Sequence, residues 1–134
     1  MHERAQPASI VAGNAVDDGA AYRGWLVGHF AGGTGAPTRT EAVEVKWGVH
    51  PAGERRAVAA VNATATSLSV LVRGRFRLDF PNRAVVLERE GDYALWRPGI
   101  AHAWLAEEDS VVVTLRWPSL PDDHAPVGSR SAGS

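Results

Sequence analysis

The sequence contains no cysteine among its 134 residues. Disulfides, thiolate nucleophiles and cysteine-ligated zinc are therefore excluded, and any metal ion would have to be held by histidine or carboxylate side chains. An excess of one charge is also missing, because 14 Lys and Arg residues stand against 15 Asp and Glu residues. Such a balance provides no overall field for nucleic acid or an anionic membrane. We therefore expect the partner to be a small molecule or a second copy of the chain.

Long hydrophobic runs are missing as well. No apolar stretch approaches the roughly 20 residues of a membrane-spanning helix, and the N-terminus has an acidic residue near its start, unlike a signal peptide. These features predict a soluble, cytoplasmic protein. The length and the 45% of hydrophobic residues suffice for one compact core. We expect a domain at residues 21–120 between flexible segments at 1–20 and 121–134, which are rich in Ala, Gly, Pro, Ser and Asp.

The dominant hydrophobic period is two, and there is no long amphipathic helical pattern. Phe76, Leu78 and Phe80 alternate with charged residues, as in a strand with one solvated face. Residues 43–47 and 111–117 alternate in the same way. Glycine and proline interrupt the chain at intervals of about ten residues, which indicates many short strands. This pattern predicts an all-β sandwich or closed barrel.

The segment GDYALWRPGIAHAW, residues 91–104, ends a strand at a Pro-Gly turn and places His102 three residues after Gly99. Proline fixes its own φ and glycine accepts backbone angles that side chains forbid, so the turn orients the histidine. Imidazole is the commonest metal ligand and the usual acid or base near neutral pH. Because Trp96 and Trp104 flank His102, we expect the three side chains to line a ligand pocket.

This segment resembles the second conserved motif of the cupins, in which a Gly-Asp strand and a Pro-Gly turn precede a metal-binding or catalytic histidine. LSVLVRGRFRLDF, with Gly74 at its centre, resembles the hairpin that closes the first cupin motif, and VHPAGE resembles the turn before it. RGWLVGHF, EVKWGVHPAGERR and AEEDSVVVTLRWPS are similar to small single-domain bacterial cupins without an assigned activity. The resemblance covers residues 40–118 and implies a double-stranded β-helix, a jelly-roll-like barrel, commonly dimeric, whose pocket often holds Fe, Mn, Ni or Zn.

The sequence departs from the first cupin motif at its metal ligands. Counting back from Gly74 places Ser67 at the usual glutamate position. The same count places Asn62 and Ala60 near the two usual histidine positions. Three of the four ligands that the resemblance implies are therefore absent in this register.

A second register offers a different ligand set. His50 and Glu54, four residues apart, are then a shifted remnant of the family's His and Glu pair. With His102 they would form the set of two histidines and one carboxylate that suits non-haem Fe(II). A metal-free pocket is the alternative. His50 is in phase with Glu44 and Lys46, so it lies on either a solvated face or a polar cavity wall.

Polar residues near these positions are candidates for binding a ligand. Arg55, in the cluster that follows the turn at 51–53, could bind a substrate carboxylate or phosphate bidentately, or simply be solvated. Asn62 falls on the expected barrel wall and could hydrogen-bond a ligand. His29 is expected to be structural, and His2 and His124, in the expected flexible segments, are expected to be solvated.

Together these features predict a small-molecule enzyme with a pocket centred on His102. His50 and Glu54 are the further candidates for metal ligation or acid/base chemistry. Without a metal, His102 would move a proton in an isomerisation, cyclisation or elimination. The alternative is a non-catalytic binding cupin in which the tryptophans form an apolar pocket. We expect a homodimer, because pairing through an edge strand would cover exposed backbone groups.

Overall fold

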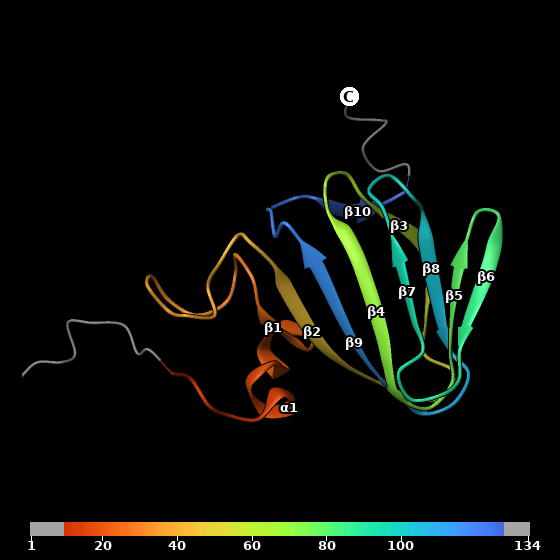
Figure 1. Cartoon of the computed structure of the whole chain (residues 1–134), viewed down its shortest axis with the longest axis horizontal. Coiled ribbons are helices and arrows are strands. Elements are labelled where there is room, and N and C mark those ends of the chain that lie inside the picture. The colour runs from red at the N-terminus through yellow and green to blue at the C-terminus, as the bar shows by residue number, and fades with distance from the viewer. Residues whose placement is uncertain (1–9, 128–134) are drawn as a thin grey trace, which may run out of the picture.

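Two five-stranded antiparallel sheets make up most of the structure, a computed structural model that describes residues 10–127 (Figure 1). The first sheet has the order β1-β2-β9-β4-β7 and the second has the order β10-β3-β8-β5-β6. None of the helices within the described residues is long and apolar enough to cross a membrane. The elements are α1 Ala15–Asp18, η2 Ala20–Tyr22 (a 3-10 turn), β1 Trp25–Val27, β2 Glu44–His50, β3 Arg55–Asn62, β4 Thr66–Arg73, β5 Phe76–Phe80, β6 Arg83–Leu87, β7 Tyr93–Trp96, β8 His102–Ala106, β9 Ser110–Trp117 and β10 His124–Pro126.

Successive strands alternate between the two sheets along most of the chain. From β2 to β5 each strand lies in the sheet opposite to the strand before it, and the same holds from β6 to β10. Only β1 with β2 and β5 with β6 are consecutive strands of one sheet. This path is that of a double-stranded β-helix, so the predicted all-β fold class is confirmed.

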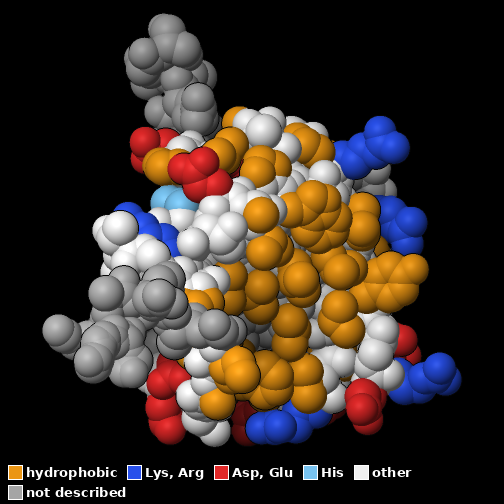
Figure 2. Space-filling view, turned by 60° about the vertical axis from the view of Figure 1, so that its left-hand side comes forward, with side chains coloured by type: hydrophobic (Ala, Val, Ile, Leu, Met, Phe, Trp, Pro, Cys, Tyr) orange, Lys and Arg blue, Asp and Glu red, His pale blue; other side chains and the backbone are white. Residues whose placement is uncertain are grey.

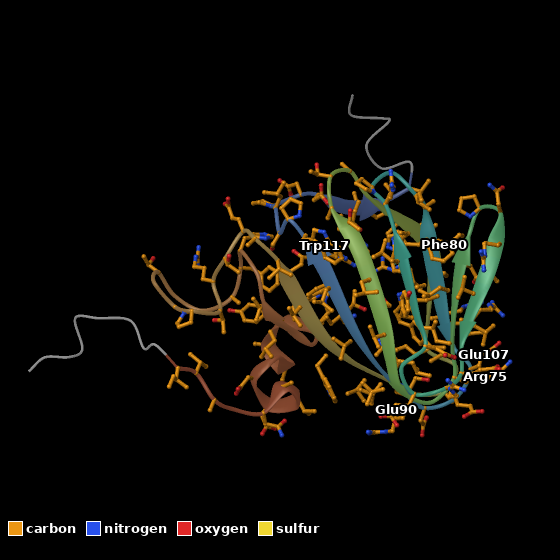
Figure 3. All side chains as sticks on the ribbon, viewed as in Figure 1. Arg75, Phe80, Glu90, Glu107 and Trp117 are labelled. Atoms are coloured by element: carbon orange, nitrogen blue, oxygen red, sulfur yellow. The ribbon has the colours of Figure 1, made fainter. Side chains whose placement is uncertain are left out.

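Gly74 turns the chain from the first sheet into the second. Its φ is 104°, in the left-handed region that favours glycine. A Cβ at this position would collide with the carbonyl oxygen of Asp109, so a side chain cannot be accommodated. Beside this turn Arg75 Nε donates to Glu107 Oε1 at 2.8 Å, and Figure 3 shows the pair at the opposite end of the sheets from Phe80 and Trp117.

The hydrophobic core occupies only part of the space between the sheets. In β5, Phe76 and Leu78 are buried, whereas Arg77 and Asp79 on the other face form an ion pair. This is the orientation that the period-two pattern predicts for one buried face. The cluster of buried core residues is Leu71, Phe76, Leu78, Leu87, Trp96, Ala106 and Val112.

The first sheet turns its polar side inward. His50 is 7% exposed, whereas its neighbour Val49, which points to the opposite face, is 54% exposed. Lys46 lies on the same face of β2 as His50 and lines the same internal cavity. Of the two positions that the sequence left open for His50, the cavity wall is therefore the one that the structure has.

The end of the described chain forms part of the second sheet. Residues 121–134 were expected to be flexible, but His124–Pro126 forms β10 and pairs with Asn62, Val61 and Ala60 of β3. The carboxylate of Asp123 holds this segment, because it accepts hydrogen bonds from Asn62 Nδ2 and from two backbone N–H groups of residues 64 and 65. Residues 1–9 and 128–134 lie outside the described residues, and α1 occupies part of the expected N-terminal flexible segment.

We predict that Asp123→Ala lowers the free energy of unfolding by about 2 kcal/mol, because buried donors lose a charged acceptor. Burial acts to raise the pKa of Asp123, but the hydrogen bonds from Asn62, Ala65 and Thr64 together lower it. Its ionised form therefore stabilises the fold above the ordinary carboxyl pKa, and this contribution is lost as the pH falls through the folded-state pKa. Urea unfolding at pH 7 measures the loss.

Asp123→Asn is the matched control for this prediction. Its amide oxygen still accepts a hydrogen bond, so this variant should lose less stability than Asp123→Ala at pH 7. The difference between the parent and Asp123→Asn should shrink as the pH is lowered. Losses near zero in both variants would show that the carboxylate does not hold β10 in place.

Candidate functional site

A cavity of about 620 Å³ lies between the two sheets, and residues of both sheets line it. This volume is in the range of small-molecule sites. A second cavity of about 370 Å³ adjoins it, because Arg23, Trp25, Arg116 and His124 line both. The polar and aromatic residues that line the larger cavity include Lys46, His50, Glu54, Arg56, Phe76, Trp96, His102, Trp104, Thr114, Arg116 and His124.

His50, at the end of β2, is hydrogen-bonded to Glu54 across the turn between β2 and β3. Its Nδ1 lies 2.5 Å from Glu54 Oε1. An ionised carboxylate only accepts hydrogen bonds, so His50 Nδ1 carries the proton and Nε2 keeps its lone pair. Gly48 gives the ring its space, because a Cβ there would lie 2.6 Å from His50 Nε2. The pair is thus fixed in one tautomer with a basic nitrogen beside the cavity.

His102 begins β8, three residues after Gly99, and is 3% exposed. Its Nδ1–H donates to the Ile100 carbonyl at 3.2 Å, which leaves Nε2 as an acceptor. Its ring centre lies 5.0 Å from that of Trp96. Burial lowers the pKa of His102 to about 4, so the imidazole is neutral at pH 7.

His124 is the cavity histidine that sequence reasoning missed. It was expected to be solvated, but β10 brings its ring centre to 5.6 Å from that of His102. Its Nε2 is buried and has no hydrogen-bond partner among residues 10–127. Burial, followed by the charge of Arg116, lowers the pKa of His124 to about 3. The residue that determines this placement is Asp123. Its hydrogen bonds join it to residues about 60 positions away, so the local sequence could not predict them.

The other candidate ligand-binding residues fall in different places. Trp96 and Trp104 line the larger cavity, whereas Asn62 lines the smaller one, where its Nδ2 donates to Asp123. Arg55 is at the exposed rim. Arg56 is half-buried and stands directly opposite Trp104 in the pairing of β3 with β8, so these two side chains share the inner face.

The donors present do not fit a metal centre of the kind that the cupin resemblance implies. Within residues 10–127 there is no group of three or more His, Asp or Glu residues placed to hold a metal ion. Ala60, Asn62 and Ser67, at three of the usual ligand positions, are buried and supply neither imidazole nor carboxylate. His50, Glu54 and His102 therefore stay a prediction as metal ligands, and we derive no chemical step through a metal.

No protein-family model and no curated protein matches the sequence. Solved structures match the fold. KdgF from Halomonas sp. has a TM-score of 0.55 and 20% identity, over 62% of this chain and 74% of that one. A Klebsiella pneumoniae protein with a double-stranded β-helix domain has a TM-score of 0.57 and 18% identity, over 65% and 76%. An RmlC-like cupin from Desulfovibrio desulfuricans has a TM-score of 0.54 and 16% identity, over 61% and 77%.

These matches and the strand order identify the same fold. The protein is therefore a cupin by fold, built as a double-stranded β-helix. Sequence identities of 20% and below establish a shared fold but not a shared activity, because one fold serves many activities. The function has to be argued from the cavity.

We predict that Glu54→Gln lowers the pKa of His50. Burial already lowers this pKa below its ordinary value, and the hydrogen bond and charge of Glu54 oppose that effect. Removing the charge of Glu54 weakens the interaction that raises the pKa of His50, while the lowering effect of burial stays. The imidazole should therefore take up its proton at a lower pH. NMR titration of the histidine ring protons, with His50 assigned through His50→Gln, measures the shift. The pKa of His102 serves as an internal control and should not move, and an unchanged His50 would contradict the pairing.

Proposed function

We propose that this cupin is a small-molecule enzyme that moves a proton on a substrate bound in the larger cavity. His50 is the base in this proposal and Glu54 is the group behind it. The observation that carries the proposal is the 2.5 Å contact between His50 Nδ1 and Glu54 Oε1 at the cavity wall. A buried imidazole that is neutral at pH 7 can accept a proton, and the carboxylate stabilises the cation that results.

His102 has a different part in the proposed reaction. It lacks a carboxylate partner among the described residues, and burial lowers its pKa to about 4, so it is neutral and not supported as a base. Its Nε2 can accept a hydrogen bond from a substrate hydroxyl and so orient the substrate. The charge that develops when a proton leaves carbon would be stabilised by the cations Lys46 and Arg116, which line the same cavity. The reaction class is then an isomerisation, cyclisation or elimination.

The experiment is proton exchange in D₂O with a panel of neutral and anionic carbonyl compounds, followed by NMR. We expect loss of the C–H signal of at least one compound, together with any product. His50→Gln should slow this exchange about 100-fold and Glu54→Gln about tenfold, because general-base catalysis contributes about 10²–10⁴. His29→Gln, which removes a histidine bonded to Ser119 and outside the larger cavity, is the control and should leave the rate unchanged.

Two other outcomes are informative. Compounds that bind without exchange or turnover would replace the proposal with the non-catalytic binding cupin that the sequence left open. The assay is repeated with Fe(II), Mn(II), Ni(II) and Zn(II). Activity that requires one of these metals, and that is lost in the His50, Glu54 and His102 variants alike, would establish the metal-dependent alternative.

A homodimer is the second part of the proposal, supported by the outer face of the first sheet. Figure 2 shows a broad hydrophobic area on the side turned to the viewer. Tyr93 and Leu95 of β7 and Trp117 of β9 are large exposed apolar residues of this sheet. Leu68 of β4 pairs with Leu95 and continues the row toward β9. Because this face presents no charge at these positions, a second copy can cover it without repulsion, whereas monomers rarely expose such an area.

We predict a dimer in light scattering at micromolar concentration and its loss in Leu95→Glu, which buries a charge in the proposed interface. The matched control is Val58→Glu, on an exposed position of β3 in the other sheet. Val58→Glu should stay dimeric. The sequence suggested pairing through an edge strand. Pairing through β1, β6 or β10, the edge strands that do not carry Leu95, predicts instead that both variants remain dimers.

A further inference from the structure

The larger cavity has one strongly cationic side. Lys46 of β2 and Arg116 of β9 both lie over the Trp25 ring, with Lys46 Nζ at 5.8 Å and Arg116 Cζ at 4.7 Å from its centre. Arg56 lies on β3 of the second sheet and lines the same cavity. Burial, followed by repulsion from Arg116 and then Arg56, lowers the pKa of Lys46 to about 8, as expected for cations gathered in one partly dry site.

Carboxylates do not balance these cations. Among the described residues that line the larger cavity, Glu54 is the only acidic one, and it is bonded to His50. Arg116 reaches Glu44 through Nη1 at 3.3 Å, but its buried Nε has no partner within residues 10–127. In the same part of the chain no ion pair joins Lys46 or Arg56 to a carboxylate. Lys46 and Arg56 are half-buried, and partly desolvated charge without an ion-pair partner is unfavourable, so this arrangement points to an anion supplied from outside.

Aromatic side chains form another part of the cavity wall. The rings of Phe76 and Trp104 are stacked, with centres 5.2 Å apart and planes at 27°. Trp96 closes this wall, and its Nε1 is buried without a hydrogen-bond partner in the described residues. Arg56 stands beside Trp104, so the cationic and aromatic sides meet at this pair. A ligand that fills the cavity therefore meets both positive groups and flat apolar rings.

We propose that the cavity binds a small aromatic or unsaturated carboxylate, with its carboxylate held by Arg56 and Lys46 and its apolar body packed against Trp104. The inference rests on the proposed function only in taking this ligand class as the substrate. A guanidinium binds a carboxylate through two parallel hydrogen bonds, which a lone hydroxyl cannot make. Inorganic phosphate would use the cationic side alone, and a neutral aromatic compound would use the aromatic side alone.

The experiment uses the full chain with benzoate and trans-cinnamate as probes, and with benzyl alcohol and inorganic phosphate as controls. Calorimetry measures affinity and tryptophan emission reports occupation of the cavity. We expect one equivalent of benzoate or cinnamate to bind at least about tenfold more tightly than either control, because the carboxylate forms charge-assisted hydrogen bonds. Equal affinity for benzoate and benzyl alcohol, phosphate binding as tight as benzoate, or no binding of either carboxylate would overturn the proposal.

Arg56→Met and Arg55→Met form a matched pair on neighbouring positions of β3. Both variants lose one positive charge, but only Arg56 faces inward beside Trp104. Benzoate should bind about tenfold more weakly to Arg56→Met and within about twofold of the parent to Arg55→Met. An equal loss of benzoate affinity in both variants would mean that only the overall positive charge attracts benzoate, and would contradict the proposed site. The comparison of benzoate with benzyl alcohol needs no variant, so it holds even if Arg56→Met fails to fold.

The two proposals fail in different ways. Carboxylate binding without proton exchange on any compound would overturn the enzyme proposal and leave the ligand class standing. Exchange confined to neutral compounds, with no carboxylate bound, would overturn the ligand class and leave the enzyme proposal standing.

Discussion

Lys46 and His50 lie on the face of β2 that is turned toward the second sheet, so charged and polar groups occupy space that a small barrel could fill with hydrocarbon. Such groups are unfavourable in a dry interior unless they are paired or hydrated. Glu44 pairs with Arg116, and His50 pairs with Glu54. The remaining cations, Lys46 and Arg56, line the space between the sheets without an ion pair among the described residues. The apolar core is accordingly confined to a cluster around Phe76 and Leu78, and the cavity takes the rest.

The fold could be predicted because its determinants are local. Period-two alternation depends on one strand at a time, as in the segment from Phe76 to Phe80 that forms β5. Gly74, where φ is positive and a neighbouring backbone leaves no space for a side chain, and the Pro-Gly turn before His102 mark where the chain must change direction. A chain that alternates and turns in this order has few ways to bury its apolar positions other than two packed sheets.

The candidate site was harder to predict because it depends on contacts between distant strands. Alternation shows that His50 and Lys46 share a face but not whether that face is inside, and the apolar residues of β2 turned out to lie on the outer side. Arg55 lies at the rim, and Arg56, one residue later, lies beside Trp104. Only the register of pairing between β3 and β8 determines which of the two arginines faces inward. His124 reaches the cavity because Asp123 bonds across to residues 62–65, in a segment whose composition indicates no strand.

The pairing of β10 with β3 has a thermodynamic consequence. This pairing places Asn62 opposite His124, and the pairing of β2 with β9 places Lys46 opposite Thr114. The cavity walls therefore come from segments that are more than half a domain apart in the chain. No short stretch of the sequence can form the cavity by itself. Any molecule that occupies the cavity is therefore linked to the global unfolding equilibrium rather than to the order of one loop. The same long-range strand pairing therefore determines both the affinity for a ligand and the cooperativity of unfolding.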